Sequence, residues 1–162
     1  MKDTDLVITR ILSGPRDRVW RAWTEPELVK RWWGPKDFTA PTIQIDLRVG
    51  GKYLFCMRGA AGPSGIRDFW STGIYQEVEA PRKLVMTDSF ADEHGNVVPA
   101  THYGMAGMPL ELLVSVTFAE ASGQTRMTLR HAGWAEDENR ELARAGWNES
   151  FDKLDALLAG GK

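Results

Sequence analysis

Cysteine is nearly absent from this sequence, and histidine is scarce. The 162 residues include one cysteine, Cys56, and three histidines. A single cysteine excludes both an internal disulfide and a thiolate metal cluster, and no two of the histidines have the spacing of a zinc site. We therefore expect a protein that uses no metal and no cofactor.

Runs of one charge and long apolar segments are missing as well. The formal net charge is −2, from 20 basic and 22 acidic residues, and the basic residues form no run, so nucleic acid and membranes are poor partners. No apolar segment approaches the ~20 residues of a membrane span. The remaining composition is that of an ordinary globular protein, and we expect one cytoplasmic domain over residues 1–162.

Established catalytic signatures are also absent. The sequence contains no H-E-x-x-H, no G-x-S-x-G, no Walker phosphate loop and no dinucleotide-binding fingerprint. The glycines at 59, 62 and 65 lack the lysine and the following helix that phosphate binding needs, so this segment is predicted to be a flexible loop. Whether the chain catalyses a reaction stays open, and no catalytic residue is assigned.

Helical patterns occupy the two ends of the chain. After a strand over residues 5–13, a Gly-Pro pair at 14–15 opens a first helix. Thr24 and Glu27 have the spacing of a capping box for a second short helix, which a Gly-Pro pair at 34–35 ends.

The last helix is predicted from about residue 136 to residue 158. Its apolar residues recur with the helical period and form one face. These residues are Ala143, Trp147, Phe151, Leu154 and Leu158.

Between residues 39 and 134 the apolar period changes from 3.6 to 2, and glycine or proline separates the segments. This pattern predicts six strands, or seven with the first one, and their short turns favour an antiparallel meander. The order of elements predicts an α+β fold in which a curved antiparallel sheet of six to seven strands packs around the long C-terminal helix.

Short motifs are spread over nearly the whole chain: Pro15, Val19 and Trp20, Thr24-x-Pro26-Glu27, Trp32-Trp33-Gly34-Pro35, Gly50-Gly51, Arg82-x-Leu84-Val85-x-Thr87, Thr128-Leu129-Arg130-His131 and Gly146-Trp147. In this order they resemble the helix-grip fold of the SRPBCC (START and birch-pollen-allergen-like) superfamily and, within it, the family of homologues of the activator of the heat-shock-90 ATPase. That superfamily includes binders, cyclases, hydrolases and chaperone activators, so the fold alone assigns no activity.

Two adjacent tryptophans, Trp32 and Trp33, stand at the predicted end of the second short helix. Neighbours on a helix point about 100° apart, so one flat surface cannot receive both rings. The resemblance implies that the two short helices close one end of a cavity between the sheet and the long helix. One ring can then fill the core while the other edges the cavity mouth, and the alternative is that both rings only pack.

Asp88 and His131 share the phase of the apolar residues on their strands, so both are predicted to face inward. A buried polar group needs a partner. As a pair they would form the polar spot of an apolar pocket and orient a carbonyl or hydroxyl group of a ligand. The alternative is structural, with His131 bonded to a backbone carbonyl and Asp88 meeting solvent. His94 and His102 are predicted to be solvated loop residues.

The same phase argument, with the implied cavity, predicts the residues that contact a ligand. Met105 and Met108 flank a glycine in a loop and are interpreted as a mobile flap over the cavity mouth. The predicted wall consists of Trp33, Phe38, Tyr53, Phe55, Trp70, Met86, Asp88, Val114, Met127, His131, Trp147 and Phe151.

The leading functional prediction is binding of a small hydrophobic molecule in this cavity, with or without cofactor-free cyclase or lyase chemistry. One alternative is a co-chaperone that acts through contact with a chaperone partner. Another is a stress or resistance protein that sequesters a toxic small molecule. The chain is expected to be a monomer or a homodimer.

Overall fold

The computed structural model describes residues 5–60, 65–135 and 137–160. Along the chain it follows the predicted order of one strand, two short helices, six further strands and a long helix. The elements are β1 (Leu6–Leu12), α1 (Arg16–Thr24), α2 (Pro26–Val29), β2 (Thr39–Ile45), β3 (Lys52–Ala60), β4 (Ile66–Glu79), β5 (Lys83–Ala91), the 3-10 helix η2 (Ala100–Tyr103), β6 (Leu112–Ala121), β7 (Gln124–Ala132) and α3 (Asp137–Ala159).

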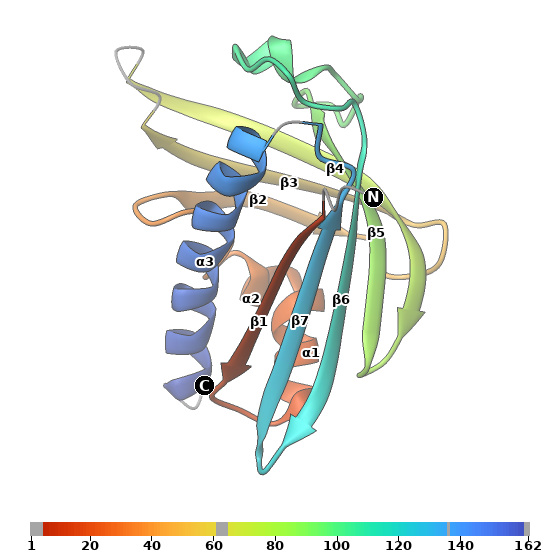
Figure 1. Ribbon diagram of the computed structural model, residues 1–162, viewed down its shortest axis with the longest axis vertical. Helices are drawn as coiled ribbons and strands as arrows, with labels where there is room; N and C mark the ends of the chain where they lie inside the picture. The colour runs from red at the N-terminus through yellow and green to blue at the C-terminus, as the bar shows by residue number, and fades with distance from the viewer. Residues whose placement is uncertain (1–4, 61–64, 136, 161–162) are drawn as a thin grey trace.

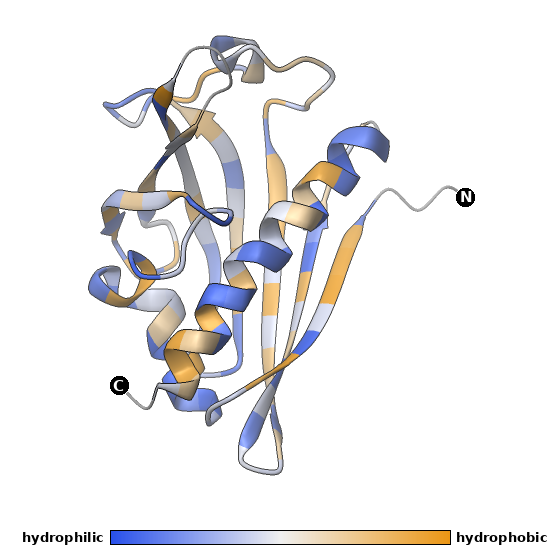
Figure 2. Ribbon diagram, turned by 90° about the vertical axis from the view of Figure 1, so that its left-hand side faces the viewer, coloured by the Kyte–Doolittle hydropathy of each residue, from blue (hydrophilic) through white to orange (hydrophobic). Residues whose placement is uncertain are grey.

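The strands form one seven-stranded sheet in the order β1-β7-β6-β5-β4-β3-β2, and every neighbouring pair is antiparallel. Strands β2 to β7 are therefore the predicted meander, and β1 adds to its β7 edge. The sheet curls, and α3 lies across its concave side together with α1 and α2 (Figures 1 and 2). The predicted α+β helix-grip fold is confirmed.

An aromatic cluster joins the helices to the sheet near α1. Trp23 of α1 has its ring centroid 4.9 Å from Trp32, 6.1 Å from Phe118 of β6 and 6.2 Å from Phe151 of α3. Trp32, Phe118 and Phe151 are at most 1% exposed. This cluster fills one end of the space between sheet and α3, which we call the closed half of the interior.

Two local predictions for α2 are wrong. The helix ends at Val29, so the two tryptophans follow it in a turn. The capping box does not form, because Thr24 is still the last residue of α1 and its hydroxyl donates to the Trp20 carbonyl at 2.8 Å. Pro26 occupies the first turn of α2, where its fixed backbone angle favours a helix start without a side-chain cap.

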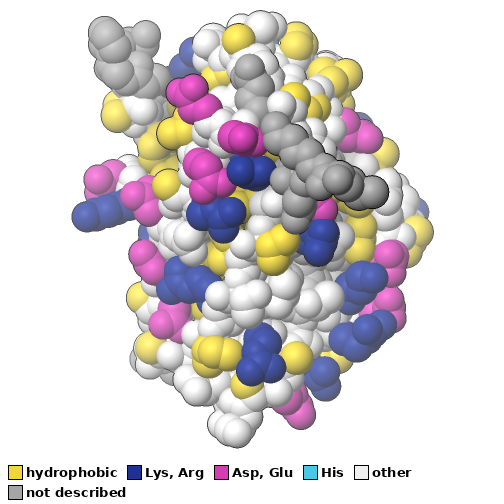
Figure 3. All heavy atoms as spheres, in the orientation of Figure 1, with side chains coloured by type: hydrophobic (Ala, Val, Ile, Leu, Met, Phe, Trp, Pro, Cys, Tyr) yellow, Lys and Arg dark blue, Asp and Glu magenta, His cyan; other side chains and the backbone are white. Residues whose placement is uncertain are grey.

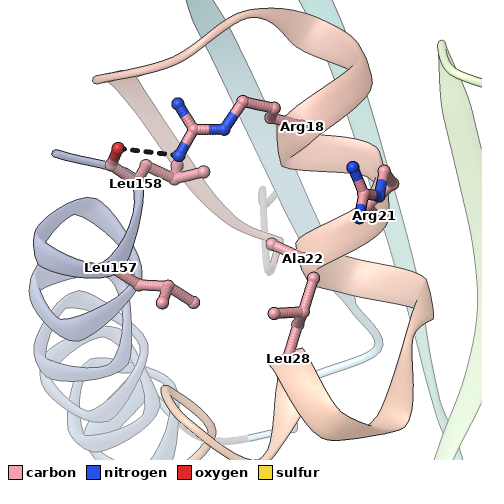
Figure 4. A pocket seen from close by; sticks show the side chains of 6 residues that line it. All are labelled: Arg18, Arg21, Ala22, Leu28, Leu157 and Leu158. Atoms are coloured by element: carbon pink, nitrogen blue, oxygen red, sulfur yellow. Dashed lines mark hydrogen bonds between the residues drawn. The ribbon is translucent and has the colours of Figure 1, made fainter. Parts of the chain in front are cut away.

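A small pocket of about 70 Å³ separates α1 and α2 from the last turn of α3 (Figure 4). The Arg18 guanidinium donates to the Leu158 carbonyl at 3.0 Å beside it. A cation at the C-terminal end of a helix meets unpaired carbonyls and the negative end of the helix dipole. We interpret this contact as a structural joint. The pocket is lined by Arg18, Arg21, Ala22, Leu28, Leu157 and Leu158.

Cys56 is fully buried in β3, and burial, with a smaller contribution from the nearby Asp68, raises the pKa of its thiol to about 11. Only the thiolate reacts with disulfide reagents. In folded protein at pH 8, Cys56 should therefore react with Ellman's reagent far more slowly than in urea-unfolded protein. A stopped-flow or spectrophotometric time course measures both rates, and equal rates would contradict the burial.

Acidic and basic side chains are interspersed over the face shown in Figure 3. Within the described part of the chain, no helix is both long and apolar enough to cross a membrane.

Candidate ligand-binding cavity

A cavity of about 400 Å³ lies between the sheet and α3. Its lining includes the segment after η2, and η2 lies at the end of the sheet away from α1 (Figure 1). We call this end the open half of the interior. Its walls come from the turn after α2, from β3 to β7, from the segment after η2 and from α3. The lining residues are Trp33, Gly34, Pro35, Phe38, Met57, Phe69, Trp70, Ser71, Asp88, Ser89, Phe90, Met105, Met108, Pro109, Leu110, Leu112, His131, Trp134, Asn139, Leu142, Ala143, Gly146, Trp147 and Ser150.

The tryptophan pair divides its two rings between core and cavity. Trp32 is fully buried, and its indole N–H donates to the Ala22 carbonyl at 2.8 Å. Trp33 is half-buried and lines the cavity, with its ring edge-on to Phe55 at 4.7 Å and to Trp147 at 5.5 Å. The placement follows the arrangement that the resemblance implied.

The ring of Phe38, which lines the cavity, packs against Gly59 of β3. A Cβ atom at Gly59 would lie 2.5 Å from the Phe38 ring, so only glycine leaves room for the ring there. Gly59 belongs to β3, contrary to the predicted start of the loop, and residues 61–64 of that loop lie outside the described residues.

A network of hydrogen-bonded side chains stands in the mostly apolar wall. His131 Nε2 lies 2.9 Å from Asp88 Oδ2, and the Trp147 indole N–H donates to His131 Nδ1 at 3.0 Å. An indole nitrogen can only donate, so Nδ1 carries no proton. The proton of the neutral ring therefore sits on Nε2 and is donated to Asp88. The side chains predicted to pair do so, and α3 supplies a third member.

The second oxygen of Asp88 is weakly engaged. Its Oδ1 lies 3.5 Å from the Tyr53 hydroxyl, which donates a stronger bond of 2.8 Å to the Thr87 carbonyl. Burial, followed by the negative charge of Asp88, raises the pKa of Tyr53 well above its usual value, so Tyr53 stays a neutral donor. The side chain of Asp88 is 26% exposed and lines the cavity.

Trp134 contributes a buried donor that the sequence did not reveal. Its ring lies edge-on to His131 at 4.9 Å, and the residue is 5% exposed. Its indole N–H finds no acceptor among the described residues. Trp134 lines the cavity, and its indole nitrogen is buried behind the wall.

The predicted flap residues Met105 and Met108 both line the cavity. The segment that carries them is tied to α3 because the Asn139 amide donates to the Ala106 carbonyl at 3.1 Å. Gly104 and Gly107 have positive φ angles of 80° and 75°, which favour glycine. The position over the cavity agrees with a flap, and its movement stays a prediction.

The predicted wall residues fall into two groups. Half of them line the cavity, namely Trp33, Phe38, Trp70, Asp88, His131 and Trp147. The other half are buried in the core and are not among the described residues that line it: Tyr53, Phe55, Met86, Val114, Met127 and Phe151.

Several lining residues were missed, although the alternation signal covered some of them. Met57, Phe90 and Leu112 continue the inward phase of their strands toward the open half and line the cavity. Asn139 and Leu142 lie on α3 outside its predicted apolar face, and Leu142 is 65% exposed, so no sequence signal singled them out.

The described residues, 5–60, 65–135 and 137–160, contain no cluster of potential metal ligands. Within these ranges no three His, Cys, Asp or Glu side chains come together to hold a metal ion. His94 is exposed in the loop after β5, as predicted. His102 is exposed as well, but it lies in the 3-10 helix η2 and not in a loop.

Comparison with known proteins agrees with this fold. A sequence model of one family, Activator of Hsp90 ATPase homolog 1-like protein, matches residues 13–159. No curated protein matches the chain. The crystal structure of protein CV1439 from Chromobacterium violaceum is similar with a TM-score of 0.77 and 27% identity, over 95% of this chain and 96% of that chain.

Two further solved structures resemble the chain to the same degree. Protein NE0264 from Nitrosomonas europaea has a TM-score of 0.75 and 28% identity, over 98% of this chain and 96% of that one. The solution structure of a protein from Arthrobacter aurescens has a TM-score of 0.77 and 28% identity, over 99% of this chain and 90% of that one. With the family match over nearly its whole length, the chain belongs to the Activator of Hsp90 ATPase homolog 1-like family, a family of SRPBCC type.

Proposed function

We propose that this protein binds a small hydrophobic molecule in the cavity of its open half. The observation that carries the proposal is a cavity of about 400 Å³ walled by aromatic and aliphatic side chains. Small-molecule sites typically measure roughly 300–1,000 Å³ and combine an apolar lining with a few placed polar groups. The Asp88–His131–Trp147 network supplies such groups.

The hydrogen bonds of His131 favour binding over general-base catalysis. A general base must offer a free nitrogen lone pair to the substrate. In His131, Nε2 carries the proton donated to Asp88, and the lone pair of Nδ1 accepts from Trp147. Proton abstraction by His131 would first require the Trp147 bond to break.

The cavity also bears on the biological alternatives. Sequestration of a toxic molecule would use the same cavity, whereas a co-chaperone acting by protein contact would not need it. The cavity therefore favours a role that involves a small ligand.

A neutral apolar dye tests the proposal directly. N-phenyl-1-naphthylamine should bind saturably, gain emission and quench tryptophan fluorescence, because Trp33, Trp70, Trp134 and Trp147 line the cavity. Native mass spectrometry of freshly purified protein should show any small molecule that co-purifies. Absence of saturable binding by several neutral apolar probes, in protein shown to be folded, would contradict the proposal.

Two alanines of α3 give a matched test of the location. Ala143 is half-buried and lines the cavity, whereas Ala145 is exposed and is not among the described lining residues. The phenyl ring of Ala143→Phe should occupy cavity space that the dye needs. The dye then loses apolar contacts, and its affinity should fall by about tenfold or more. Ala145→Phe makes the same change in helix propensity and should leave the dissociation constant unchanged. Equal effects in a fluorescence titration would place the dye elsewhere.

A further inference from the structure

We propose that the cavity selects apolar molecules that carry a hydrogen-bond donor, a hydroxyl or a protonated amine, over apolar molecules that carry a carboxylate. This inference rests on the proposed function and concerns the polar part of the same cavity. It follows from the negative charge of the cavity wall and from an acceptor oxygen of the wall that lacks a close donor.

The charge of the polar network is fixed by the direction of its hydrogen bonds. Trp147 donates to His131 Nδ1 at 3.0 Å, and a protonated Nδ1 would face that donor with a second hydrogen. His131 is therefore neutral in this arrangement, and the Asp88 carboxylate is left with its negative charge. The network brings one net negative charge to the cavity wall.

No cationic side chain of the described lining neutralises that charge. Among the described residues that line the cavity, none is lysine or arginine, and Asp88 is the one carboxylate. The Asp88 carboxylate repels an anionic ligand, and this repulsion is stronger in a medium of low dielectric constant than in water. A ligand carboxylate placed beside Asp88 would lose its water and meet repulsion in return.

The free acceptor capacity of Asp88 calls for a donor on the ligand. Its Oδ2 accepts from His131 at 2.9 Å, but its Oδ1 has only a long contact of 3.5 Å to Tyr53. A carboxylate oxygen accepts up to two bonds, and bonds to a charged acceptor are roughly twice as strong as neutral ones. A hydroxyl or ammonium group that reaches Asp88 would complete this oxygen.

The other polar groups of the wall do not reverse the preference. Ser71, Ser89 and Ser150 carry hydroxyls, which donate or accept as needed, and the amide nitrogen of Asn139 already donates to Ala106. The buried N–H of Trp134 finds no acceptor among the described residues. A ligand hydroxyl can donate to Asp88 and accept from a serine hydroxyl, so these groups agree with the preference.

Four probes with the same naphthalene body separate the possibilities: 2-naphthylmethanol, 2-naphthylmethylamine, 2-naphthoic acid and 2-methylnaphthalene. Each is titrated at pH 7 by calorimetry or by displacement of N-phenyl-1-naphthylamine. The dissociation constants of the alcohol and the amine should be lower than that of the naphthoate by a factor of about ten or more, as expected for one additional hydrogen bond to a charged group.

The results distinguish the two proposals. Equal or tighter binding of the naphthoate would overturn the selectivity while leaving the binding function intact. If none of the four probes binds, the proposed function fails, and the selectivity fails with it.

Asp88→Asn tests the residue behind the preference. The amide oxygen can still accept from His131, but the negative charge is lost, so the ratio of amine to naphthoate affinity should fall by about tenfold or more. Asp46→Asn makes the same charge change at an exposed position and should leave the ratio unchanged. An unchanged ratio in Asp88→Asn would overturn the assignment. If thermal melting shows that this variant does not fold, the wild-type probe series alone decides.

Discussion

Replacing Trp32 by alanine should lower the free energy of unfolding by about 3–5 kcal/mol, the range measured for large aromatic residues removed from protein cores. Trp32 is fully buried and contacts the rings of Trp23, Trp33 and Phe151. Alanine would leave a cavity among these rings and would remove the donor to the Ala22 carbonyl. Urea denaturation followed by far-UV circular dichroism measures the loss.

Trp33→Ala is the matched control, because the same substitution is made one residue further along. Trp33 is half-buried and faces the cavity, so its removal should cost clearly less stability than that of Trp32. It should instead weaken binding of N-phenyl-1-naphthylamine, since the ring forms part of the cavity wall. Equal losses of unfolding free energy would contradict the division of the pair between core and cavity.

Replacing His131 by leucine should lower the free energy of unfolding by about 2–4 kcal/mol, because it leaves two polar groups without their partners. Asp88 loses the donor on Nε2, and the Trp147 indole loses its acceptor on Nδ1. Asp88 is 26% exposed, so water recovers part of its hydrogen bonding. Most of the loss is therefore expected from Trp147, whose indole N–H is left without an acceptor.

His131→Gln separates hydrogen bonding from ring packing. The glutamine amide offers one donor and one acceptor with a separation similar to that of the two ring nitrogens, so it should recover part of the stability that leucine loses. His102→Leu alters an exposed histidine and should change the unfolding free energy by no more than about 0.5 kcal/mol. Equal melting midpoints for the leucine and glutamine variants of His131 would show that the network contributes nothing.

The sequence predicted which side of each strand faces inward, because alternation with period two depends on local geometry. Tyr53 and Phe55 face inward as expected, and so does Met57 further along β3. Alternation does not tell how far along the strand the closed half ends and the open half begins. That boundary is set by where α1 and the bulky rings of Trp23 and Phe118 fill the space.

The same limit explains the division on β5 and α3. Met86 is buried in the core, whereas Asp88, two residues later on the same face, lines the cavity. Phe151 is buried in the core and Trp147, one turn earlier, lines the cavity. The Asp88–His131 pairing was predictable from phase, but the bond from Trp147 depends on the rotation of a helix that is distant in sequence from both.

The boundary between the closed and the open half has a consequence for redesign and for divergence of such chains. Substitutions at Met57, Phe69 or Leu112 would reshape the cavity without opening a void in the buried aromatic cluster of the closed half. The residues of the closed half thus specify the fold, whereas those of the open half specify the ligand. A library confined to the open half should therefore yield many folded variants with altered ligand preference.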